Sequence, residues 1–227
     1  MKNILARGGI EFLAVLLGIS GSLWIDSNNK SLELKSKTTE VYSLLENQTD
    51  ELINYTTNKL NEYDKQLVRY NALINDWDTF NYDTIVNKKE YISDIWFSIQ
   101  NAYYPDFSIY ETLINSGEIN LINFNTIRRF GRLYESMEDI YNVQKKEREW
   151  RDFIENYLMN NYSNLFKEYS LPYDLFEFFK LTKNDNIIFA HLKSIESLHT
   201  TRKIRVSFIR DTLNEIKDNL LELKESK

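Results

Sequence analysis

Residues 41–74 read VYSLLENQTDELINYTTNKLNEYDKQLVRYNALI, and large side chains recur in this stretch at steps of three and four residues. This spacing places them on one face of a helix, so the stretch predicts a long helix with a buried seam. We favour a helix of a bundle over a free-standing coiled coil, because several seam positions hold Gln or Tyr. The seam consists of Val41, Leu45, Gln48, Leu52 and Tyr55 and, after a shift of one residue, Leu60, Tyr63, Leu67, Tyr70 and Ile74.

The rest of the chain is expected to be helical as well. Only six glycines and two prolines occur, too few for the frequent turns of a β-protein. Gly117 is expected to end one helix, Asn123 or Asn125 to begin another, and Asn184 with Asp185 to cap the last. The predicted helices after the seam are 88–104, 108–116, 126–164, a short aromatic one opening at 171–176, and 186–225. The predicted fold class is all-α: an N-terminal transmembrane helix in residues 1–26, then a single antiparallel bundle of long helices in residues 27–227.

The transmembrane prediction depends on residues 4–25, ILARGGIEFLAVLLGISGSLWI. As a helix this stretch measures about 33 Å, which matches a hydrocarbon core of roughly 30 Å. A cleaved signal peptide ending near Gly21 or Ser22 and a buried helix are the alternatives, although no clear cleavage site follows. The predicted location is the bacterial inner membrane, single-pass, with the N-terminus in the cytoplasm and the helical domain in the periplasm.

Five residues of this stretch form the candidate site. Glu11 lies four residues after Arg7 and can pair with it, and an acid within a membrane span is a candidate functional residue. Glu11 could equally lie at the membrane interface, neutralised by Arg7. Ala14, Gly18 and Ser22 recur every four residues, a spacing that lets two helices approach closely. The predicted partner of this face is the membrane and, within it, another integral membrane protein or a second copy of the chain.

Several features together resemble a known family. The anchor carries Gly9, Glu11, Gly18 and Ile19, and residues 113–117 read LINSG, followed by Leu121 and Ile122. In these features the chain resembles an uncharacterised family of single-span proteins of Bacteroidota, which has a Glu-containing anchor and a helical extracytoplasmic domain. The family's Trp just past the span falls here on Asn28, a departure from the pattern. The resemblance implies location and architecture, and it implies no activity.

The sequence offers little chemistry. It has no cysteine, and no phosphate-binding loop or catalytic-triad pattern occurs. Glu196 and His199 have the spacing of a di-iron ligand pair, but no second copy exists, so we expect no metal and a His199 on the surface. The basic residues at 202–210 could hold an anion or a lipid headgroup, although pairing with acids of the chain is favoured. We therefore predict no enzyme activity and no cofactor.

The net charge of −6, spread along the chain, argues against a nucleic-acid partner. The favoured function is a membrane-anchored accessory or scaffold protein whose transmembrane helix packs against a membrane partner or against itself. The alternative is a periplasmic helical bundle that senses a ligand and signals through a partner protein.

Overall fold

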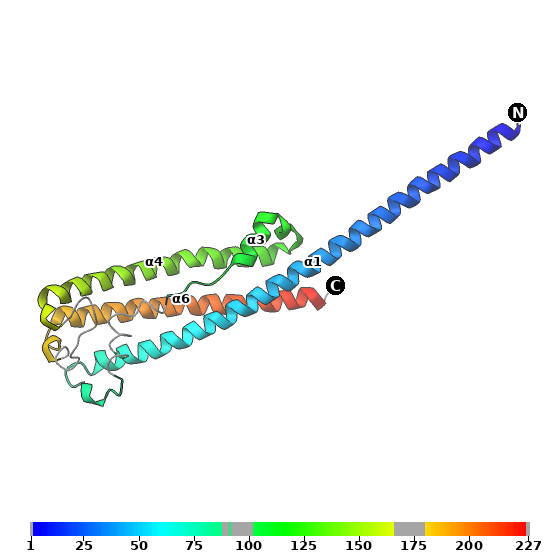
Figure 1. The fold of residues 1–227 in the computed structure, drawn as a ribbon. Helices are drawn as coiled ribbons and strands as arrows, with labels where there is room; N and C mark the ends of the chain where they lie inside the picture. The colour runs from blue at the N-terminus through cyan, green and yellow to red at the C-terminus, as the bar shows by residue number, and fades with distance from the viewer. Residues whose placement is uncertain (1, 88–90, 92–101, 166–179, 226–227) are drawn as a thin grey trace.

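Every regular element in the described part of this computed structural model is a helix, so the predicted all-α class is confirmed (Figure 1). The structure describes residues 2–87, 91, 102–165 and 180–225, with side chains in α1 from residue 17 onward. Three long helices lie side by side and form the bundle. The elements are α1 (Lys2–Asn75), η1 (Tyr82–Thr84), α3 (Ser108–Ser116), η2 (Glu118–Leu121), α4 (Phe124–Asn161), η3 (Ser163–Leu165) and α6 (Asn186–Glu225).

Helix α1 is unbroken from residue 2 to residue 75, so it passes through the predicted domain limit at residues 26 and 27. In the bundle its seam is buried, with Tyr55 and Ile74 only half-buried. At those two places the neighbouring residues Thr56 and Leu73 occupy the core instead. The stretch 41–74 is therefore a bundle helix, as its stepping predicts, and it is continuous with the N-terminal part of α1.

The predicted helix ends are set by local capping. Gly117 has φ of 75°, a left-handed conformation that glycine adopts without strain, and its N–H donates to the carbonyl of Ile114. Asn123 caps α4, because its side chain accepts from the N–H of Asn125 at 2.7 Å. Asp185 caps α6 in the same way by accepting from the N–H of Ile187 at 2.9 Å. Helices α3 and α6 have the predicted bounds, and α4 begins and ends slightly earlier than predicted.

Helix α6 is the central helix, since both α1 and α4 pack mainly against it. Their buried apolar residues fall into two clusters along the bundle. The proximal cluster, near α3, includes Val41, Leu45, Leu52, Leu60, Tyr63, Phe130, Leu133, Met137, Ile140, Val206, Ile209, Leu213, Ile216 and Leu220. The distal cluster contains Tyr70, Leu73, Trp77, Ile154, Leu158, Ile188, Leu192 and Ile195.

Polar residues of the α1 seam anchor the connecting segment 102–107, which covers the proximal cluster. The Gln48 side chain donates to the carbonyl of Asp106 at 3.2 Å and accepts from the N–H of Tyr110 at 3.0 Å. The Tyr103 hydroxyl lies 2.8 Å from that of Thr56, and the Tyr103 N–H donates to the Gln144 side chain. These hydrogen bonds explain why a buried seam carries Gln and Thr.

Two predicted helices are not tested in full. The predicted helix 88–104 falls mostly outside the described residues, and its described end, residues 102–104, is not helical. The predicted short helix at 171–176 lies wholly outside them.

The structure contradicts the predicted location as a single-pass protein of the bacterial inner membrane. In the part of the chain that the structure describes, no helix carries a stretch long and apolar enough to cross a bilayer.

Candidate functional site

The N-terminal part of α1 extends beyond the bundle (Figure 1). We call residues 17–36 of this part the projecting segment. Where α1 enters the bundle, the Lys37 ammonium pairs with the Glu118 carboxylate of η2 at 2.8 Å. Before that point the projecting segment exposes its large apolar side chains, with Trp24 70 % exposed. The exposed apolar residues of the segment are Leu17, Ile19, Leu23, Trp24, Ile25, Leu32 and Leu34.

The predicted site residues lie on this end of α1. Gly18 and Ser22 are exposed on the projecting segment, and a Cβ added at Gly18 would meet no atom within 4 Å. Arg7, Glu11 and Ala14 lie on the helical backbone of α1, but their side chains are outside the described set. The structure therefore brings neither Gly18 nor Ser22 against another described element, and packing through these five residues stays a prediction.

An exposed helix of this composition favours burial. Apolar side chains at residues 17, 19, 23, 24 and 25 point in several directions around the helix, so no single polar face meets the solvent. Most helical stability in proteins comes from packing of apolar faces rather than from intrinsic propensity. The chemistry available to the projecting segment is apolar association.

A second candidate site lies inside the bundle, between the proximal and distal clusters. We call Glu147 of α4 with His199 and Arg202 of α6 the polar layer. Arg202 Nη1 donates to Glu147 Oε2 at 2.5 Å, and the guanidinium lies 4.4 Å from the centroid of the Tyr63 ring. The His199 ring packs edge-on against Tyr70, at 5.1 Å between centroids, and its Nε2 lies 3.8 Å from Glu147 Oε1. The polar layer thus joins all three long helices.

The polar layer is almost removed from solvent. The side chains of Arg202, His199 and Glu147 are 5 %, 6 % and 11 % exposed. Within the described residues, Glu147 Oε1, His199 Nδ1 and Arg202 Nε have no hydrogen-bond partner. Buried polar atoms are normally paired, so three such atoms at one level of the bundle are unusual.

Burial sets the protonation of the polar layer. It raises the pKa of Glu147 to about 7, outweighing the Arg202 and Arg148 guanidiniums, which lower it. It lowers the pKa of His199 to about 3, and the Arg202 charge adds to this effect. Burial also raises the pKa of Tyr63 above its ordinary value. Near neutral pH, Glu147 is therefore the group of the layer that exchanges a proton.

The prediction of a surface histidine is wrong, because His199 is only 5 % exposed. Buried positions of α6 step by three and four residues from Ile195 through His199 and Arg202 to Val206, so both polar residues lie in register with the core. This stepping was visible in the sequence and indicated burial of both residues, but their polar side chains led to the prediction of a surface position. The favoured pairing of the basic residues at 202–210 with acids of the chain is confirmed. Arg202 pairs with Glu147, Lys203 with Asp64, Arg205 with Asp139 and Arg210 with Asp211.

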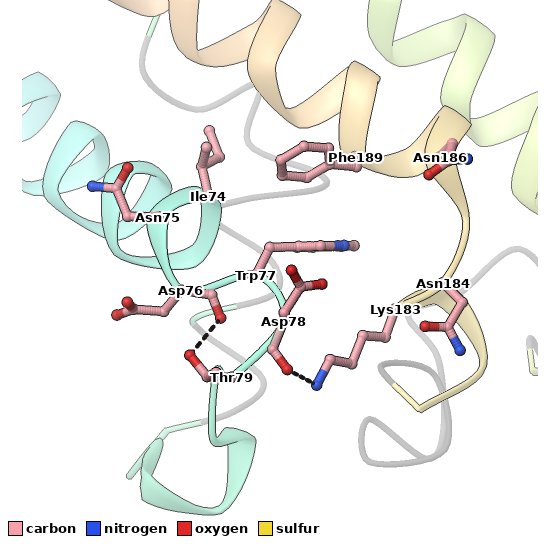
Figure 2. Close-up of a pocket in the computed structure, with 10 residues that line it drawn as sticks. All are labelled: Ile74, Asn75, Asp76, Trp77, Asp78, Thr79, Lys183, Asn184, Asn186 and Phe189. Carbon is pink, nitrogen blue, oxygen red and sulfur yellow. Dashed lines mark hydrogen bonds between the residues drawn. The ribbon is translucent and has the colours of Figure 1, made fainter.

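A cleft of about 520 Å³ lies at the distal end of the bundle (Figure 2). Trp77 and Phe189 line it, and their ring centroids lie 5.3 Å apart. Lys183 reaches across from the segment before α6 and donates to the carbonyl of Asp78. The remaining walls of the cleft are mostly amide and carboxylate side chains: Asn75, Asp76, Asn184 and Asn186. Such a lining suits a small polar ligand better than an apolar one.

Comparisons with protein-family models, with curated proteins and with solved structures gave no match for this chain. The geometry of the two candidate sites therefore carries the functional argument. No group of histidine and acidic residues suited to a metal ion occurs in the described part of the chain. The Glu196 carboxylate instead accepts a hydrogen bond from the Thr200 hydroxyl at 2.9 Å.

Proposed function

We propose that the protein is a helical accessory or scaffold protein that binds a partner helix along the projecting segment of α1. The observation that carries the proposal is the exposure of large apolar side chains on a helix that has left its bundle. Exposed apolar patches of this kind are typical of protein interaction sites. The partner is another protein or a second copy of the chain.

The bundle supplies a rigid base for such a segment. Helix α1 is continuous from the core into the projecting segment, so the exposed side chains have a fixed direction relative to the bundle. Ion pairs lock α1 to α6 below the exit point, including Asp50 with Lys217 at 2.7 Å. A helix anchored in this way pays less ordering entropy on binding than a free peptide does.

Site-specific photo-crosslinking tests the proposal. A photoreactive phenylalanine analogue replaces Trp24 in the full-length chain, and the matched control places it at Val68, which is 69 % exposed on the same helix but beside the bundle. We expect a discrete crosslinked species from position 24 and none from position 68 in extracts of the native host. A crosslink that also forms with purified chain identifies the partner as a second copy. The crosslink should disappear when Leu17 and Ile25 are both replaced by Glu. Equal crosslinking at both positions, or none at either, contradicts the proposal.

A ligand-sensing bundle is the second candidate, and the distal cleft is the observation that favours it. Its test is the thermal midpoint of the purified chain in the presence of amino acids, sugars and nucleotides. We expect a compound that raises the midpoint of the wild type but not that of Asn186→Ala, with Lys145→Ala on the exposed face of α4 as the control. A panel without any such compound argues against this candidate.

A further inference from the structure

The buried face of α6 repeats so regularly that its apolar residues do not define a single position along the bundle. Buried residues recur on this face at alternating steps of four and three residues, and all of them except His199 and Arg202 are Ile, Leu or Val. The positions are Ile188, Leu192, Ile195, His199, Arg202, Val206, Ile209, Leu213, Ile216 and Leu220. A shift of α6 by seven residues, about 10 Å along its axis, would therefore change the apolar contacts little.

Helix α4 carries the same repeat, and Glu147 lies in it. Its buried residues step by four and three from Thr126 to Leu158. Seven residues to either side of Glu147 are Ile140 and Ile154, and both are buried. A shift of α6 by one repeat would bring Arg202 to the level of one of these isoleucines and leave Glu147 facing an apolar residue. Each buried charge would then lack its partner, which is strongly unfavourable.

The buried amide and hydroxyl groups described above fix other parts of the bundle. Gln48 and Gln144 bind the backbone of the connecting segment 102–107, and the Thr56 hydroxyl lies against that of Tyr103. These contacts hold α1 and α4 to the connecting segment, and none of them involves α6. The Glu147–Arg202 pair is the buried polar contact that ties α6 to α4.

Exposed ion pairs favour the same position of α6. Arg205 of α6 pairs with Asp139 of α4. The residues seven positions from Asp139 are Arg132 and Lys146, so a shift in either direction would bring Arg205 to a basic residue. Because water screens exposed pairs, each contributes little, and the buried pair is the main determinant.

We propose that the Glu147–Arg202 pair sets the axial register of α6, and with it the point at which α1 leaves the bundle. Leu220, near the end of α6, belongs to the same cluster as Val41, which lies near the exit point of α1. A shift by one repeat would lengthen or shorten the part of α1 beyond α6 by about 10 Å. Residues 162–185 connect α4 to α6, and this is enough chain to span such a shift. The proposal goes beyond the binding function and does not depend on it.

Moving the carboxylate by one repeat tests the proposal. The variant Glu147→Ile/Ile154→Glu places the acid seven residues further along α4 and leaves Arg202 unchanged. The chain has no cysteine, so Glu135→Cys and Ala190→Cys provide spin-label sites at exposed positions of α4 and α6. The distance between the labels is measured at pH 8 by pulsed electron paramagnetic resonance in the full-length protein. The two helices run antiparallel, as their ion pairs show, so we expect the distance to be about 10 Å longer than in the labelled wild type.

The exposed pair provides the matched control. Asp139→Leu/Arg205→Met removes an ion pair between the same two helices and should leave the label distance unchanged. A folded variant with the moved carboxylate that keeps the wild-type distance overturns the proposal, and so does an equal shift in the control.

A second variant decides if the moved carboxylate prevents folding. Glu147→Leu/Arg202→Met has no buried charge in the layer, so nothing buried then distinguishes one repeat from the next. We expect a second label distance, displaced by about 10 Å, beside that of the wild type. The wild-type distance alone contradicts the proposal.

Discussion

Removing either partner of the Glu147–Arg202 pair should destabilise the protein far more than removing both. The two side chains are 11 % and 5 % exposed, and their charged atoms lie 2.5 Å apart. Loss of one partner of such a pair costs about 3–5 kcal/mol, because the other charge stays buried without compensation. We therefore expect Arg202→Met and Glu147→Leu each to lower the free energy of unfolding by about 3 kcal/mol or more at pH 8, where Glu147 is ionised. The Arg202 change also removes a contact with Tyr63, worth roughly 0.5–2 kcal/mol.

The double variant Glu147→Leu/Arg202→Met tests whether the ion pair makes a net contribution to the free energy of unfolding. Apolar replacement of both partners is often neutral or stabilising by about 1–4 kcal/mol, since neither charge then needs to leave water. Urea unfolding of wild type, both single variants and the double variant closes the cycle. We expect the double variant to be more stable than either single one.

A matched control uses Asp139 and Arg205, which pair across the same two helices but are 62 % and 42 % exposed. Removing either of these should change the stability by less than about 1 kcal/mol. The reasoning is refuted if the single variants of the buried pair also cost less than about 1 kcal/mol. It is also refuted if the loss of unfolding free energy in the double variant equals the sum of the losses in the two single variants.

Three further predictions concern acid stability and helix ends. Burial lowers the pKa of His191 to about 4, so the folded state favours the neutral ring. This contribution to the free energy of unfolding is fully present above pH 6.5 and is lost as the pH falls, with a loss of roughly 3 kcal/mol by pH 4. A His191→Gln/His199→Gln variant should therefore lose less stability than wild type in urea unfolding between pH 6.5 and pH 4, although Glu147 acts in the opposite direction there. Gly117→Ala should cost about 1 kcal/mol in urea unfolding, because Ala is strained at φ of 75° while its Cβ meets no atom within 4 Å; an unchanged midpoint contradicts this. Asp185→Ala should cost about 2 kcal/mol, because it removes the α6 cap and two tyrosine hydrogen bonds, and circular dichroism melting measures it against Asp185→Asn as the milder change.

Local signals in the sequence were sufficient for most of the helices. Helix α6 was predicted from a capping pair and a regular apolar stepping, and both signals involve residues within a few positions of each other. Gly117 and Asn123 fixed the ends of α3 and α4 for the same reason. Capping energies of about 1 kcal/mol act within one helical turn, so they do not depend on the rest of the fold.

The polar layer could not be predicted in this way, because its pairing depends on contacts between helices far apart in the chain. Glu147 and Arg202 are 55 residues apart, and each lies within a charged run that indicates a solvated surface. Only their register with the buried residues of α4 and α6 distinguishes them from their exposed neighbours. The same limit applies to Gln48, whose partner Asp106 is 58 residues away.

The projecting segment and the distal cleft lie at opposite ends of α1. The projecting segment needs α1 to be held firmly, and the proximal cluster does this by packing its seam from Val41 to Tyr63. The polar layer lies just beyond Tyr63, between the anchored part of α1 and its distal end at Leu73 and Trp77. A change confined to the distal cleft should therefore leave crosslinking through position 24 unchanged, and loss of that crosslink in Asn186→Ala would show that the two ends of α1 are not independent.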